Sequence, residues 1–230
     1  VLLIKKFINE KNDYQFALPG DLVGMNEEGN HMQDESEIID LIKRYERMVE
    51  DGGSHYFDVE EFEVMIEHYL GFGSVKRAQK VLQYASSLFP ESLTLQLREA
   101  QILASVGKHL KAVSRLKTLL AFEPNNEEIH LTLASVYSKI SEHKLSITHF
   151  NKALITAEAE IQSEIIQDIA IEHENLGEWR KAIELLKKCL KKDMTFESAL
   201  FELAFCYDQV NDIKSAVIFF EEYLNEKPYS

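Results

Sequence analysis

The sequence predicts an all-α protein built from stacked antiparallel helix hairpins. Three observations support this fold class: a repeat over most of the chain, few helix-breaking residues, and a large apolar fraction. The 230-residue chain contains nine Gly and four Pro, which is few for its length and favours helices. Its 45% of hydrophobic residues can form a substantial core, in one large domain or two small ones.

The repeat is visible in small residues that recur within amphipathic segments. One series lies midway through the second segment of each copy: Ala78, Ala112, Ser146, Ala182 and Ala216. The residues twelve positions earlier are Ile66, Ala100, Ala134, Ala170 and Ala204. The copies then begin at residues 59, 93, 127, 163 and 197, in steps of 34, 34, 36 and 34. Small residues are expected where the two helices of a hairpin approach closely, and large apolar residues fill the space between them.

Each copy also provides a turn between its two helices. The residues at this turn are Gly73, Gly107, Ser141, Gly177 and Asn211. Three copies close with a proline, at Pro90, Pro124 and Pro228, a residue that cannot continue a helix. Because one hairpin cannot bury its apolar face alone, we expect the copies to stack on one another.

The third copy reads Leu133-Ala134-Ser135-Val136-Tyr137, followed by Phe150, Ala153 and Leu154. This arrangement resembles the L-G-x-x-Y…F-x-x-A-L skeleton of the tetratricopeptide repeat family, and the resemblance covers residues 59–230. It implies a right-handed α-solenoid superhelix whose concave surface is lined by the first helix of each hairpin. The family's early Trp is absent from all five copies. Two extra residues lie within 155–162, where we expect an extended helix or an altered turn.

The expected organisation has three parts. Residues 1–31 fit no repeat and are irregular or left from a cloning site. Residues 32–58 form an N-terminal capping helix, over 35–50, and a linker, with Asp58 and Glu61 as a capping box. The five-repeat array then has its copies at 59–92, 93–126, 127–162, 163–196 and 197–230.

The charge balance argues against polyanionic partners. Lys plus Arg is 25 against 39 Asp plus Glu, a net charge of −14, which repels nucleic acid and anionic membrane surfaces. No apolar run approaches the ~18 residues needed to cross a bilayer, and no secretory signal is visible, although a leader could have preceded Val1. Cys189 and Cys206 lie in helical patterns, as small buried thiols of a reducing compartment do, so we expect a cytoplasmic protein.

No motif for catalysis or cofactor binding is present. The sequence lacks phosphate-binding glycine loops, a nucleophile elbow, H-E-x-x-H and paired C-x-x-C. His143 and His149 are six residues apart and would point in different directions on a helix, so we expect no metal site. Cys189 and Trp179 are interpreted as packing residues. The sequence therefore predicts a protein that is not an enzyme and has no cofactor.

The resemblance implies a peptide groove lined by one stripe on the first helices. Its candidate residues are Glu60, Glu63, Glu67, Leu97, Gln101, Glu128, Leu131, Ser135, Glu164, Gln167, Ile171, Glu174, Phe201, Phe205 and Asp208. The full stripe also contains Leu70, Thr94, Ala104, Ser138 and Ser198. Carboxylates are about twice as frequent in this stripe as in the whole chain, and Lys and Arg are absent from it. The alternative is that these charges form an ordinary solvated face.

We therefore expect a non-catalytic scaffold that binds a peptide or protein segment in this groove, with a basic or apolar partner favoured over an acidic one. Some family members hold the C-terminal carboxylate of a chaperone with paired Lys and Asn residues, and this stripe lacks those residues. Phe201 and Phe205 are expected to form a contact site, or to pack on a further repeat or subunit. Two alternatives stay open: an oligomerising array that associates through its apolar C-terminal end, and the regulatory N-terminal part of a longer enzyme.

Overall fold

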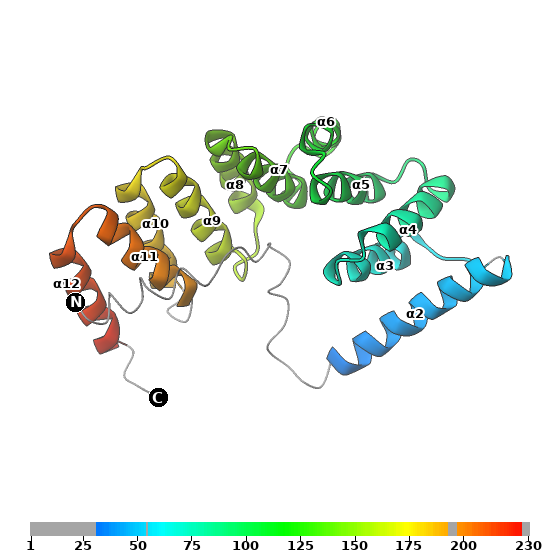
Figure 1. The fold of residues 1–230 in the computed structure, drawn as a ribbon, viewed down its shortest axis with the longest axis horizontal. Coiled ribbons are helices and arrows are strands. Elements are labelled where there is room, and N and C mark those ends of the chain that lie inside the picture. Colours follow the sequence, from blue (N-terminus) through cyan, green and yellow to red (C-terminus); the bar gives the residue numbers. More distant parts are fainter. Residues whose placement is uncertain (1–30, 54, 193–196, 227–230) are drawn as a thin grey trace. The chain divides into compact units, whose positions relative to one another are not determined.

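The computed structural model describes residues 31–53, 55–192 and 197–226. Over these residues the chain is a succession of helices without a strand (Figure 1). The irregular segment expected at the N-terminus, up to residue 30, and the closing Pro228 lie outside the described residues. The helices that the structure describes are α2 (His31–Asp51), α3 (Val59–Gly71), α4 (Val75–Leu88), α5 (Leu93–Ser105), α6 (His109–Leu119), α7 (Glu127–Lys139), α8 (His143–Thr156), α9 (Gln162–Asn175), α10 (Trp179–Lys192), α11 (Glu197–Gln209) and α12 (Ile213–Glu226).

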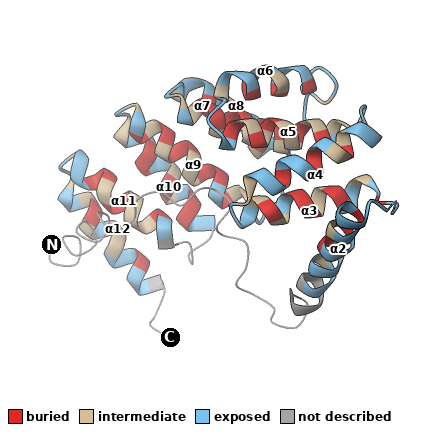
Figure 2. Cartoon of the chain, turned by 45° about the vertical axis from the view of Figure 1, so that its right-hand side comes forward, coloured by how far each residue is buried: buried red, intermediate tan, exposed pale blue. Residues whose placement is uncertain are grey.

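The helices pair as antiparallel hairpins, which confirms the predicted all-α class and its stacked hairpins. Each odd-numbered helix packs on the helix that follows it, as α3 does on α4 and α7 on α8. The described residues form two compact units, which we call the N-terminal unit (31–122) and the C-terminal unit (123–226). Buried residues lie along the sides on which the helices of a unit meet, and exposed residues cover the other sides (Figure 2).

In the N-terminal unit, α2 packs on the first hairpin through an aromatic cluster. Tyr45 of α2 contacts Phe57 and Phe62 edge-on, with ring centroids 5.9 and 6.4 Å apart. The predicted capping box is present: Asp58 Oδ1 accepts a hydrogen bond from the Glu61 amide at 2.8 Å, and Glu61 Oε2 accepts one from the Asp58 amide at 3.1 Å. Such a box satisfies two amides that a helix start would otherwise leave unpaired, so it fixes where α3 begins.

The core of the C-terminal unit depends on small residues at helix crossings. Ala134, Ala170, Ala182 and Ala204 are all buried at the points where first and second helices approach. Cys189 lies in the same core, and its Sγ donates a hydrogen bond to the Ser163 carbonyl at 3.4 Å. Protein interiors are packed to near-crystalline density, so these positions have no room for a larger side chain.

The five turns inside the hairpins share a left-handed residue, as their position in the repeat predicts. Three are glycines, and the other two are Ser141 at φ 60° and Asn211 at φ 53°. The Glu142 amide closes its turn by donating to the Tyr137 carbonyl at 2.8 Å. A left-handed backbone is unfavourable for residues with a Cβ, so Ser141 carries strain that a glycine would not.

Compared with the first copy, the two extra residues are divided between a turn and the helix after it. α8 ends at Thr156 and α9 begins at Gln162, so the turn is 157–161 where residues 89–92 connect α4 to α5, and α9 has 14 residues where α3 has 13. Gln162 Nε2 donates a hydrogen bond to the Ala157 carbonyl at 2.8 Å and holds the ends of this turn together. α2 also differs from its expected range, since it begins at His31 and not at residue 35.

Candidate functional site

The predicted stripe lies on α3 and α5 in the N-terminal unit and on α7, α9 and α11 in the C-terminal unit. Within a unit, polar contacts connect residues from successive first helices. In the C-terminal unit Ser198 Oγ of α11 donates a hydrogen bond to Gln167 Oε1 of α9 at 3.0 Å. Cys206 Sγ of α11 lies 3.3 Å from Glu174 Oε1 of α9 and donates to it. Neighbouring first helices therefore present their stripe residues side by side.

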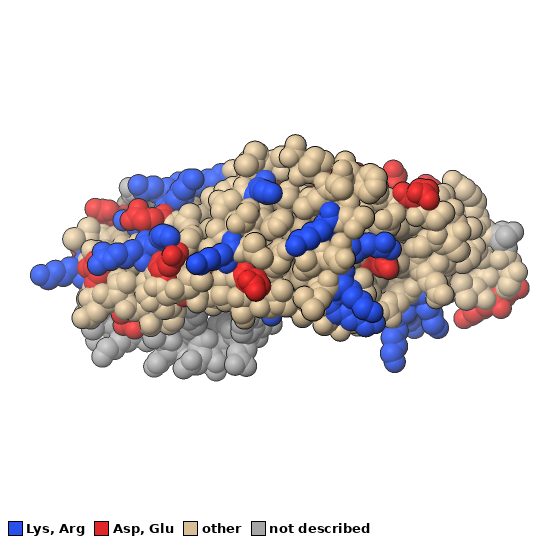
Figure 3. All heavy atoms as spheres, turned by 90° about the horizontal axis from the view of Figure 1, so that it is seen from above, with Lys and Arg blue, Asp and Glu red and all other residues tan. Residues whose placement is uncertain are grey.

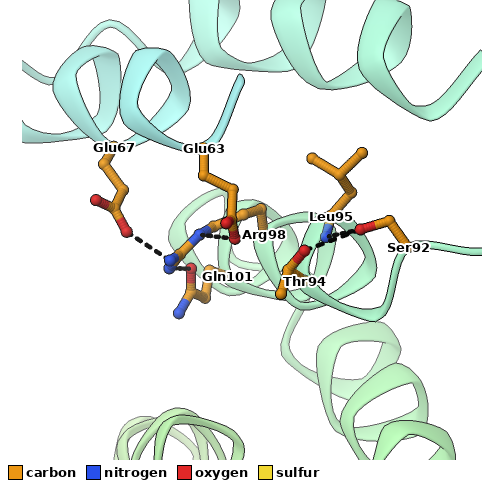
Figure 4. Close-up of polar contacts among 7 residues, drawn as sticks. All are labelled: Glu63, Glu67, Ser92, Thr94, Leu95, Arg98 and Gln101. Carbon is orange, nitrogen blue, oxygen red and sulfur yellow. Dashed lines mark hydrogen bonds and ion pairs between the residues drawn. The ribbon is translucent and has the colours of Figure 1, made fainter. Parts of the chain in front are cut away.

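In the N-terminal unit a base beside the stripe pairs with its carboxylates, and the sequence analysis missed it. Arg98 of α5 points between Glu63 and Glu67 of α3 (Figure 4). Its Nε lies 3.6 Å from Glu63 Oε1 and its Nη2 2.5 Å from Glu67 Oε1. Its Nη1 donates to Gln101 Oε1 at 2.9 Å. The Arg98 side chain is only 12% exposed, so its charge is held among these carboxylates and offsets them.

The stripe itself holds no Lys or Arg, as the sequence shows, but a base from the adjacent position reaches its carboxylates. Arg98 follows the stripe residue Leu97 in the sequence, and its long side chain reaches across to the preceding first helix. The sequence does show that Arg98 is the one base of α5, but a charge alone does not indicate in which direction the side chain points.

Burial separates the stripe residues into accessible and enclosed ones. Leu97 is 4% exposed and Glu174 8% exposed, so neither offers its side chain to a partner, contrary to the expectation. Phe201 and Phe205 are half-buried and not fully exposed. The ring of Phe205 lies edge-on against Trp179, with centroids 5.7 Å apart. The exposed stripe residues are Glu60, Glu67, Thr94, Glu164, Ser198 and Asp208, and the half-buried ones include Glu63, Gln101, Glu128, Leu131, Ser135, Gln167 and Ile171.

α9 carries a row of carboxylates beside the stripe. Glu164, Asp168 and Glu172 are spaced by four residues and so share one face of the helix. Burial, together with the charges of Glu164 and Glu172, raises the pKa of Asp168 from 3.8 to about 7. Glu172 is buried and lies 2.7 Å from Nδ1 of His143. Of this row, the sequence analysis named Glu164 as a groove residue and missed Asp168 and Glu172, although the four-residue interval was visible in the sequence.

The histidines of α8 do not converge on one site. His143 contacts Glu172, whereas Nδ1 of His149 lies 2.9 Å from Nδ1 of His130 on α7. His130 is buried, and its Nε2 lies 3.0 Å from the Pro124 carbonyl; the burial lowers the pKa of His130. In the part of the chain that the structure describes, no three His, Cys, Asp or Glu side chains are grouped to hold a metal ion.

A separate hollow of about 530 Å³ lies between α4, α5 and α6 of the N-terminal unit. Gln83, Phe89, Gln96, Glu99 and Arg115 are among its lining residues. Arg115 is paired with Glu99, so the charges in this hollow compensate each other. It shares no residue with the stripe. Over the described residues, no helix is both long and apolar enough to cross a membrane.

Comparisons with known proteins support the fold. The sequence matches no family model and no curated protein. Among solved structures, the chain is similar to "MamA 41-end from Desulfovibrio magneticus RS-1", with 19% identity and a TM-score of 0.60 over 74% of this chain and 97% of that one. A "MamA RS-1 ArsTM double mutant" also has 19% identity and a TM-score of 0.60, over 72% of this chain and 92% of that one. "Crystal structure of MamA protein" has 17% identity and a TM-score of 0.58, over 72% of this chain and 90% of that one.

At these identities the similarity establishes the helical-repeat fold. The resemblance to the tetratricopeptide repeat family and the five-copy division of residues 59–230 stay predictions.

Proposed function

We propose that this chain is a non-catalytic protein-interaction scaffold that binds a peptide or protein segment on the first helices of its hairpins. Stacked helix hairpins offer an extended surface that no single helix provides. The contact between Ser198 and Gln167 is the observation that supports the proposal best, because it places stripe residues of two successive first helices next to each other. A segment lying across the stripe would then contact α9 and α11 together.

The charges on this surface favour a basic segment in the C-terminal unit. α9 contains four carboxylates and no Lys or Arg, and Glu164 and the Asp208 carboxylate of α11 are exposed. Exposed acidic groups attract Lys and Arg and increase the association rate, more strongly at low salt. Half-buried Ile171 and Phe201 add apolar area near them. In the N-terminal unit Arg98 offsets the carboxylates, so we expect weaker attraction of a basic segment there.

The experiment is a titration of a fluorescent Lys/Arg-rich peptide at low salt. Reversing two exposed carboxylates, Glu164→Lys with Asp208→Lys, is expected to weaken binding about tenfold, because exposed charge pairs contribute about 0.2–1 kcal/mol each and reversal turns attraction into repulsion. The matched control is Glu221→Lys with Glu222→Lys, two exposed residues of α12, with less than about a threefold effect. Equal loss in both variants, or none in either, contradicts the proposal.

A second function, self-association, is favoured by the last described helix. Ile218 is 57% exposed and Leu224 43% exposed on α12, and exposed apolar side chains of this size are a common feature of interfaces. Light scattering over a concentration series tests the idea. The mass is expected to rise with concentration in the wild type and to stay monomeric in Ile218→Lys. A wild type that stays monomeric at the highest concentration excludes this function.

We also propose a reducing compartment such as the cytoplasm. Cys189 and Cys206 are both buried thiols that form no disulfide, as is usual for proteins of such compartments. Determining where a tagged chain resides in the cell tests this placement.

A further inference from the structure

Basic residues are concentrated on the second helices, although the chain has a net charge of −14. α4, α6 and α8 contain Lys or Arg and no acidic residue. α10 contains six bases and one carboxylate, Glu184. By contrast, α3 and α9 contain four carboxylates each and no Lys or Arg. α12 departs from this pattern, with one Lys and three Glu; the opposite signs are separated between α3 and α4 and between α9 and α10.

The strongest concentration of bases is on α10. Its inward side is apolar, and Ala182, Ile183, Leu186, Cys189 and Leu190 are all buried. The bases lie on the opposite side, at the spacing of successive helical turns. We call them the α10 basic face: Arg180, Lys181, Lys187, Lys188, Lys191 and Lys192. In Figure 3, Lys and Arg side chains project from the surface in the left-hand part of the view, with Asp and Glu side chains among them; α9, α10, α11 and α12 lie in this part of Figure 1.

The exposed carboxylate Glu184 lies on the same side of α10, within one turn of Lys187 and Lys188, and Arg180 acts on the Asp212 carboxylate. The rest of this charge is only partly compensated by contacts inside the chain. Lys181 pairs with Glu178 at 3.0 Å, and Lys192 donates to Gln162 Oε1 at 2.5 Å, an uncharged partner. Lys187 lies over the Phe219 ring, 5.5 Å from its centroid. Lys188 and Lys191 are exposed, and neither forms an ion pair with a carboxylate among the residues that the structure describes.

A hollow of about 370 Å³ lies at the start of the α10 basic face. Its lining includes Trp179, Val210, Arg180 and Lys181, so apolar side chains are combined with two bases. Glu178 also lines it but is already paired with Lys181 and with Nδ1 of His173 at 2.6 Å. A partner side chain that is apolar, with acidic neighbours, fits this combination.

We propose that the α10 basic face is a docking surface for an acidic segment of a partner protein, anchored by an apolar side chain in the hollow beside Trp179. The face is distinct from the first-helix stripe, so one C-terminal unit would hold two partners of opposite charge.

The dimensions and surroundings favour a protein segment over a nucleic acid. From Arg180 to Lys191 the face extends about 17 Å, at 1.5 Å per helical residue. Exposed carboxylates lie beyond it on neighbouring elements, Glu164 on α9 and Glu221 and Glu222 on α12. A phosphate backbone is charged along its whole length and would be repelled where it left the face. A short acidic segment concentrates its charge within the face and avoids those carboxylates.

A membrane surface fits less well for a different reason. Helices that bind membranes bury their apolar side in the lipid. The apolar side of α10 packs in the core of the C-terminal unit, so it is not available for insertion.

The test uses the full chain and three labelled probes at low salt. They are an Asp/Glu-rich peptide with one Leu, a single-stranded oligonucleotide of the same charge, and vesicles with about one third anionic lipid. The peptide is expected to bind most tightly, with an affinity that falls as salt rises. Lys188→Glu with Lys191→Glu is expected to weaken peptide binding at least tenfold, and Lys188→Gln with Lys191→Gln to give an intermediate loss.

The matched control is Lys139→Glu with Lys152→Glu, which changes the net charge equally at two exposed positions of α7 and α8. It is expected to reduce peptide binding less than threefold. The binding of the basic peptide to the stripe is expected to survive the Lys188 and Lys191 changes, which separates this surface from the proposed function. Equal loss in the control, no binding of the acidic peptide, or tighter binding of the oligonucleotide or vesicles through the same lysines overturns the proposal.

Discussion

Replacing Asp168 by Asn is expected to stabilise the C-terminal unit at neutral and alkaline pH. Burial and the charges of Glu164 and Glu172 raise the pKa of Asp168 from 3.8 to about 7. The folded state therefore keeps a proton that the unfolded chain has lost between pH 4 and 7. Because the native state binds more protons in this interval, the free energy of unfolding falls as pH rises through it and is level above pH 7.

The size of the effect follows from the two pKa values. Each pKa unit corresponds to about 1.4 kcal/mol. The interval from 3.8 to about 7 therefore lowers the free energy of unfolding by about 4 kcal/mol by pH 8. About a third of this loss is already present at pH 5, where the unfolded chain is ionised and the folded one is not. An amide has nearly the same shape and no charge. Asp168→Asn is therefore expected to be more stable than wild type by about 4 kcal/mol at pH 8, and by about 1 to 2 kcal/mol at pH 5.

Urea unfolding at pH 5 and pH 8 measures this difference. Trp179 is the one Trp of the sequence and lies in the C-terminal unit, so its fluorescence reports on the unit that contains Asp168. Comparing the variant with wild type at each pH removes the effect of His130, whose lowered pKa acts in the opposite sense and reduces stability as pH falls below its ordinary value.

Asp208→Asn is the control, because Asp208 is an exposed carboxylate of the same unit and its substitution is expected to change stability by less than about 0.5 kcal/mol. A stability gain for Asp168→Asn that is equal at pH 5 and pH 8 would refute the reasoning, since the gain must grow as the unfolded chain ionises.

Three further substitutions test the fold and the site. Ser141→Gly is expected to stabilise the protein by about 0.5–1 kcal/mol, because a left-handed Ser costs about 1–2 kcal/mol and the greater entropy of Gly in the unfolded chain offsets part of the gain. Asn211→Gly is expected to be near neutral, because Asn tolerates this conformation. Thermal unfolding compares the two variants. Ala182→Leu is expected to cost about 1–3 kcal/mol by overpacking in the same assay, against little change for exposed Ala159→Leu. Arg98→Leu is expected to reduce the stability of the N-terminal unit by about 1–2 kcal/mol in urea unfolding followed by circular dichroism, and to increase basic-peptide binding; unchanged stability would show that the contacts to Glu63 and Glu67 contribute little.

The hairpins were predictable because their signals are local and repeat. A residue suited to a left-handed turn recurs at one position of the repeat, and a small residue suited to a close helix crossing recurs at another. Few backbone arrangements other than a helix hairpin are compatible with both. The start of α2 was less predictable, because residues 31–34 are His-Met-Gln-Asp, and a single apolar residue gives no helical period. A helix can extend through such residues when no Gly or Pro stops it.

The site was predictable in position and less so in accessibility. A rotation of about 100° from the core stripe places Leu97 and Glu174 at the edge of the buried region, where the packing of a neighbouring helix decides whether they are covered. Arg98 and Asp168 were missed for a related reason. Both occupy the same position in their repeats, one residue after a stripe residue; Arg98 reaches the neighbouring first helix from there, and Asp168 is affected by Glu164 and Glu172 of its own helix. Sequence spacing gives that position, but the length of the side chain and the partner across the helix pair decide its role.

The separation of charge between first and second helices has a physical basis in the hairpin. α9 and α10 meet through small and apolar residues such as Ala170 and Ala182, so neither of these helices needs a charged partner on the other, unlike α5 and α6, where Arg115 pairs with Glu99. Each helix then has one remaining surface of its own, and residues on these two surfaces can change independently. In the C-terminal unit this leaves α9 with carboxylates alone and α10 with six bases. An ion pair between them would neutralise both surfaces, and the contact from Lys192 of α10 to Gln162 of α9 uses an amide and not a carboxylate. The packing of α9 on α10 therefore keeps the carboxylates and the bases on separate surfaces. The two proposed partners of opposite charge require such a separation.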